Sequence, residues 1–74
     1  MSAADDPRPR LLAAARAHAE QRGWPWLEPV DIRLTSAAER LWTIRTNAEA
    51  VGMNVRIVVR ESDAVIVQSG YLAR

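Results

Sequence analysis

The residue with the widest catalytic use in this 74-residue chain is a single histidine, His18. Nucleophilic catalysis needs such a base beside a serine, threonine or cysteine, and the chain contains no cysteine. None of its four serines lies in the glycine-flanked turn that exposes a catalytic serine. His18 falls at the edge of the apolar face of a predicted helix, so we interpret it as a flanking or surface residue without a catalytic role.

The acidic residues and the potential metal ligands give no stronger indication of catalysis than His18 does. Asp5 and Asp6 are typical of a chain start and a helix cap, and Glu61 and Asp63 are typical of a hairpin turn. An acid–base pair needs a site that excludes water, which neither position offers. One histidine without cysteine does not complete a zinc site, and the scattered glycines form no phosphate-binding loop. The sequence therefore predicts no metal site, no cofactor and a non-enzymatic protein, with a small enzyme kept as an alternative.

All ten basic residues are arginine, although the formal net charge is only +1. A GC-rich genome accounts for this usage without any function. The alternative is a functional preference for the planar guanidinium, which matches carboxylate and phosphate groups. The composition, with 49% hydrophobic and 26% charged residues, is that of a globular domain. Because no apolar run reaches the length of a membrane span and no signal peptide is recognisable, we expect a cytoplasmic protein.

One helix is predicted in the first third of the chain. Asp6 offers a cap oxygen, Pro7 suits the first helical position, and strong helix formers follow as far as Arg22. Gly23 is the expected left-handed stop. The apolar face of this helix is formed by Leu11, Leu12, Ala15 and Ala19. After it, the proline-containing segment 24–29 forms a rigid connector.

After Pro29 the apolar period changes to two, which is typical of strands. We expect strands over residues 30–34, 42–45, 54–60 and 64–69, with turns over 35–39 and 61–63 and Gly70 closing the last strand. The connections are too short for parallel crossovers. The prediction is a single α+β domain over residues 1–74, with residues 1–6 loosely ordered. One N-terminal helix packs on one face of a three- or four-stranded antiparallel sheet.

The same alternation places an arginine-rich surface on the other face of the sheet. The candidate partner-binding residues on that face are Arg33, Arg45, Arg56, Val58 and Arg60. Thr43 and either Ala64 or Ile66 are expected to share the face. It is either an ordinary solvated surface or a docking surface for an acidic protein or a second copy. Nucleic acid is the alternative ligand, but the near-zero net charge and the lack of stacking aromatics on this face disfavour it.

Trp24 and Trp26 complete the candidate partner-binding residues. They flank Pro25 in the connector, where they either seal the edge between helix and sheet or recognise a partner. The sequence leaves open whether the Trp24–Pro25 bond is cis. A small open sheet also leaves edge strands unpaired, so residues 30–34 or 64–69 are candidates for homodimerisation.

The order of these segments resembles known small α+β domains. A helix of small residues precedes Trp42–Ile44, Asn54–Arg60 and Ala64–Val67. This arrangement is similar to PepSY-like and cystatin-like domains and to some small bacterial immunity proteins. The resemblance covers residues 11–69 at the level of pattern. It implies a binding or inhibitory role without catalysis, and it assigns no functional residue.

Overall fold

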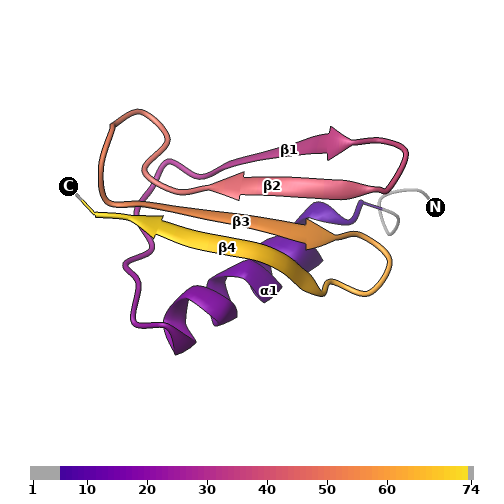
Figure 1. Cartoon of the computed structure of the whole chain (residues 1–74), viewed down its shortest axis with the longest axis horizontal. Helices are drawn as coiled ribbons and strands as arrows, with labels where there is room; N and C mark the ends of the chain where they lie inside the picture. Colours follow the sequence, from indigo (N-terminus) through magenta and orange to yellow (C-terminus); the bar gives the residue numbers. More distant parts are fainter. Residues whose placement is uncertain (1–5, 74) are drawn as a thin grey trace.

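The computed structural model describes residues 6–73, which form one helix packed on a four-stranded antiparallel sheet. The elements are α1 (Arg8–Gln21), β1 (Asp31–Ser36), β2 (Leu41–Arg45), β3 (Asn54–Arg60) and β4 (Ile66–Leu72). The strands follow one another in the order β1-β2-β3-β4, and in Figure 1 α1 runs obliquely behind β3 and β4 and continues below β4. The predicted α+β class is confirmed, with four strands. The expected loose start falls mainly on residues 1–5, which lie outside the described residues.

The end of α1 forms at the predicted signal, whereas its start lies one residue later than predicted, with Pro7 in the cap position. The Asp6 carboxylate accepts a hydrogen bond from the Arg8 amide at 3.0 Å. At the other end, Gly23 has a φ of 73° and the Trp24 amide donates to the Ala19 carbonyl at 2.9 Å. This is the glycine-terminated helix end in which the chain turns back over the last helical turn. As a result, Trp24 packs against the core.

The core lies between α1 and the face of the sheet that it covers. Its fully buried members are Leu11, Ala15, Ala19, Ile44, Val55, Ile57 and Val59. Small alanine side chains let α1 lie close to the sheet. The tryptophans and the outer aliphatic side chains then pack around this centre.

The register fixes which residues share each face, because directly paired residues of an antiparallel sheet point to the same side. Ile44 of β2 pairs with Ile57 of β3 on the side of α1. The pairs immediately before and after this one are Thr43 with Val58 and Arg45 with Arg56. These pairs therefore lie on the opposite side of the sheet, which we call the open face.

The last strand differs from the prediction. β4 begins at Ile66 and runs through Gly70 to Leu72, so Gly70 does not close the strand. It pairs instead with Arg56 in the middle of the β3–β4 ladder. A glycine fits there because the position is on an edge strand and faces away from the core. The expectation that Ala64 or Ile66 shares the open face is also wrong, since both pack against the core.

The first hairpin also departs from its predicted limits. β1 extends to Ser36, so part of the segment expected as a turn is strand. The turn follows over residues 37–40, and Arg40 there has a φ of 54°. A bulge between Leu34 and Ser36 accommodates the extra residue. The one cis peptide bond among the described residues is Glu28–Pro29, not Trp24–Pro25.

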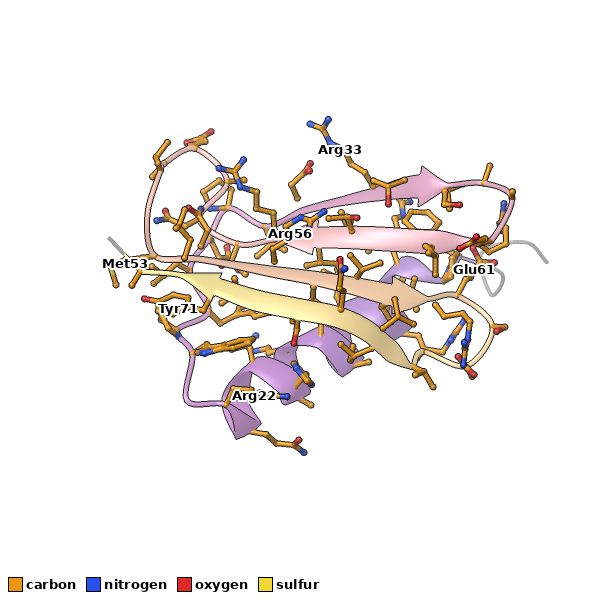
Figure 2. The ribbon with its side chains drawn as sticks, in the orientation of Figure 1. Arg22, Arg33, Met53, Arg56, Glu61 and Tyr71 are labelled. Carbon is orange, nitrogen blue, oxygen red and sulfur yellow. The ribbon has the colours of Figure 1, made fainter. Side chains whose placement is uncertain are left out.

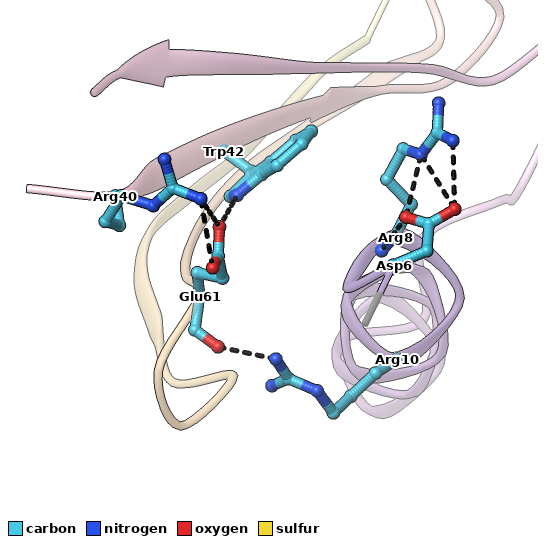
Figure 3. A network of polar contacts seen from close by, with 6 residues as sticks. All are labelled: Asp6, Arg8, Arg10, Arg40, Trp42 and Glu61. Atoms are coloured by element: carbon cyan, nitrogen blue, oxygen red, sulfur yellow. Dashed lines mark hydrogen bonds and ion pairs between the residues drawn. The ribbon is translucent and has the colours of Figure 1, made fainter. Parts of the chain in front are cut away.

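Glu61, predicted as a turn residue, ties together three parts of the fold (Figure 3). Its carboxylate accepts hydrogen bonds from the Trp42 indole at 2.8 Å and from Arg40 at 3.2 Å. Its carbonyl oxygen accepts a bond from Arg10 of α1 at 2.7 Å. The indole donor and the Arg40 guanidinium together lower the pKa of the Glu61 carboxyl. The turn after β3 is thereby fastened to β2 and to the start of α1.

Candidate binding site on the open face

Two of the four candidate arginines are neutralised within the protein. The Arg33 Nε lies 2.8 Å from a carboxylate oxygen of Asp31, two residues earlier on the same strand. Arg60 contacts the Asp63 carboxylate with both Nε and a terminal nitrogen, at 3.0 and 2.7 Å. Hydrogen bonding to Arg60 lowers the pKa of the Asp63 carboxyl. These two arginines therefore already have carboxylate partners.

Arg45 and Arg56 differ from them, because within residues 6–73 neither forms an ion pair. They are direct cross-strand partners on β2 and β3, and both are exposed. Arg45 donates to the Ala50 carbonyl at 3.3 Å, and its other cross-strand partner, Asp31, is engaged with Arg33. Like charges placed directly opposite one another destabilise a sheet. The pair is therefore a local cost to the free protein that an external anion would remove.

A hollow of about 560 Å³ lies beside this arginine pair. It is lined by Arg45, Asn54, Arg56 and residues 68–72, and we call it the β4 hollow. Gly70 leaves it open: a Cβ atom added there would have nothing within 4 Å. Because Gly70 is the cross-strand partner of Arg56, the vacant space lies directly next to that arginine. In Figure 2 Arg56 lies over the sheet, on the side away from α1.

Asn54 shapes the loop beside the β4 hollow. Its side-chain nitrogen donates to the carbonyl groups of Thr46, Asn47 and Ala50, at 2.9, 2.9 and 3.2 Å. Its side-chain oxygen accepts from the Gly52 amide at 2.8 Å. With only 4% of its surface exposed, Asn54 is the internal scaffold of the loop between β2 and β3. The sequence analysis missed this residue, although an asparagine at the start of a strand, where this residue type is uncommon, was a usable signal.

Val58 occupies the centre of the open face but is only 8% exposed. Its direct neighbours across the sheet are Thr43 and Gln68. The structure therefore places it beneath the surface rather than in a position to make extensive contacts with a partner.

Trp24 and Trp26 are both partly buried against the core. Trp24 lies between His18 and Tyr71, with ring centroids 6.0 and 6.1 Å away, and the Arg22 guanidinium lies 5.7 Å from its ring. Trp26 lines a second hollow of about 370 Å³ between α1 and the connector. Both positions agree with sealing the edge of the core, and neither residue adjoins the arginine pair on the open face.

The structure brings His18 and Ser69 together, which the sequence analysis did not anticipate. His18 Nε2 and Ser69 Oγ are 2.9 Å apart, although the residues are separated by 51 positions. Among the described residues no carboxylate hydrogen-bonds to His18, and Ser69 lies within a strand rather than on a strand–helix turn. This contact links β4 to α1.

Two further observations cover the described part of the chain. No three histidine, cysteine, aspartate or glutamate side chains gather there as a metal site would require. In residues 6–73 there is also no helix with the length and apolar character needed to cross a bilayer.

Comparisons with protein-family models, curated proteins and solved structures found no match to this chain. The resemblance to PepSY-like and cystatin-like domains therefore stays a prediction.

Proposed function

We propose that this protein is a non-enzymatic binding module that takes an acidic segment of a partner protein on its open face. The observation that carries the proposal is the Arg45–Arg56 pair, two arginines directly opposite each other on β2 and β3 that form no ion pair among the described residues. A carboxylate placed between them would replace repulsion by charge-assisted hydrogen bonds. Binding would thus remove an unfavourable contact as well as add favourable ones.

The surroundings of the pair support a peptide ligand. The β4 hollow, at about 560 Å³, has room for a few side chains. Its rim offers the polar side chain of Gln68 and the apolar side chain of Leu72, which is 56% exposed. An acidic segment with interspersed apolar or small residues matches this mixture.

Nucleic acid remains the second candidate, because phosphate would also bind the two arginines. Single strands are usually held by stacking their bases on exposed aromatic rings. Tyr71, the aromatic residue of β4, is instead stacked on Trp24. This contact favours a protein ligand over a nucleic acid.

The proposal is tested with a short, end-blocked peptide of alternating glutamate and threonine. Its glutamine-for-glutamate counterpart and an oligothymidine strand serve as comparison probes. Fluorescence anisotropy at low salt should show binding of the glutamate peptide in preference to both. Replacing Arg45→Gln and Arg56→Gln together should weaken that binding by about tenfold or more, since two charge-assisted contacts are lost.

The matched control is the double variant Arg16→Gln with Arg60→Gln, which changes the net charge equally and leaves Asp31 engaged with Arg33. Arg60 is already paired with Asp63, and Arg16 lies on α1, so we expect a loss of no more than about threefold, from long-range attraction alone. Equal losses in the two double variants would contradict a local site. Stronger binding of oligothymidine than of the glutamate peptide would favour the nucleic-acid alternative.

A further inference from the structure

The two edges of the sheet are protected to different degrees. β1 carries the Asp31–Arg33 ion pair and a bulge, both of which discourage pairing with another strand. From Ala64 to Ala73, the segment containing β4 has neither a charged residue nor a proline. In the sheet formed by residues 6–73, β4 has a neighbour on one side only. It is therefore the edge at which another strand meets the least obstruction.

The regular part of this edge is short and well defined. The β3–β4 register shifts between Val58 and Val59, which leaves Val67 as an extra residue near the start of β4. Beyond this bulge, residues 68–72 pair with β3 without interruption. Gln68, Ser69 and Gly70 are all exposed. Five regular residues match the usual length of a paired strand.

The same residues, 68–72, form one wall of the β4 hollow, so the hollow reaches this edge of the sheet. Arg45, Arg56 and Gly70 stand in one cross-strand row on the open face. A residue of an added strand directly opposite Gly70 would point its side chain to the same face. This added residue would lie about 10 Å from β3, which is two strand spacings. Gly70 lies between the two and has no side chain to block the space. Glutamate and arginine side chains can meet across that gap.

We propose that the acidic partner segment binds by strand addition along Gln68–Leu72, with one carboxylate reaching over Gly70 to Arg56. The inference rests on the proposed function, because the acidic character of the segment comes from there. Backbone hydrogen bonds to β4 supply affinity, and the arginine pair selects the acidic side chain. A second copy of the chain fits less well, since β4 brings no carboxylate to the arginines.

The first test changes Gly70, using the glutamate–threonine peptide as the probe. In the variant Gly70→Glu the protein's own carboxylate faces Arg56, so peptide binding should weaken by about tenfold or more. The variant Gly70→Ala is the control, because the added Cβ meets open space. It should bind within about twofold of the wild type. Unchanged binding by Gly70→Glu would overturn the proposal.

The second test separates the binding mode from the proposed function. Two versions of the peptide are methylated on alternate backbone nitrogens, one on each of the two possible sets. Because only one set of N–H groups can face β4, one version should bind about tenfold or more weaker and the other little changed. Amide exchange should slow at residues 68–72 when the parent peptide is bound.

The outcomes are distinguishable. If both methylated peptides bind as the parent does, while binding still depends on Arg45 and Arg56, strand addition is wrong and the acidic-ligand function stands. If the parent peptide does not bind at all, the proposed function fails with it. A dimer of the free chain with residues 68–72 protected from exchange would show that a second copy occupies β4, and would also overturn the proposal.

Discussion

Replacing Asn54 by alanine is expected to lower the free energy of unfolding by roughly 3 kcal/mol, because buried backbone groups lose their partners. Asn54 is almost fully buried, and its side chain satisfies three carbonyl groups and one amide of the loop between β2 and β3. In a chain of this size that loss is a large part of the total stability. Urea denaturation followed by tryptophan fluorescence measures it directly.

The matched control for this prediction is Gln68→Ala, which also shortens a side-chain amide beside the β4 hollow. Gln68 is exposed and forms no side-chain hydrogen bond with the described residues. Its replacement should change the free energy of unfolding by less than about 0.5 kcal/mol. If Asn54→Ala cost no more than this control, the asparagine network would not hold the loop in place.

The second large effect tests the two-sided character of β3. Ile57 and Val58 are neighbours in sequence, and both are replaced by threonine, which keeps the branched shape that suits a strand. Ile57→Thr puts a hydroxyl into the fully buried core, and we expect a loss of roughly 3 kcal/mol in the free energy of unfolding. Val58→Thr places the hydroxyl on the open face between Thr43 and Gln68. Its cost should stay near or below about 1 kcal/mol.

Thermal and urea unfolding of the two variants give the comparison. Equal losses at positions 57 and 58 would mean that both sides of β3 are packed against protein. The open face would then not be available to a partner, whatever its charge.

Local sequence signals predicted most of the fold. The stop at Gly23 and the alternation over residues 54–60 each act within a few neighbouring residues, and both are confirmed. The limits of β4 were predicted wrongly because a glycine inside a strand looks the same in sequence as a glycine that ends one. What keeps Gly70 in the strand is its pairing with β3, and that depends on the whole sheet.

The arginine surface was predicted only in outline. Alternation placed Arg33, Arg45, Arg56 and Arg60 on one face, as the register does. Which of them have carboxylate partners was partly readable, since Asp31 and Asp63 lie two and three residues away from their arginines. That Arg45 faces Arg56 depends on the register of β2 against β3.

Contacts between distant elements were beyond this kind of reasoning. His18 meets Ser69 only because of the angle at which α1 crosses the sheet. The four hydrogen bonds of Asn54 likewise require the path of the loop between β2 and β3, in which Asn47, Gly52 and Met53 all have positive φ. No short sequence pattern encodes these geometries.

The central claim is that Arg56 serves to bind a ligand and does not stabilise the fold. One measurement on the free protein tests this claim. The free energy of unfolding is compared for the wild type, Arg56→Glu and Arg33→Glu, in low and in high salt. Arg56→Glu converts a repulsive cross-strand pair with Arg45 into an attractive one, so stability should rise by about 1 kcal/mol in low salt. The gain should shrink in high salt. Arg33→Glu should instead lower stability, because it sets two carboxylates side by side. A loss of stability in Arg56→Glu equal to that in Arg33→Glu would contradict the account.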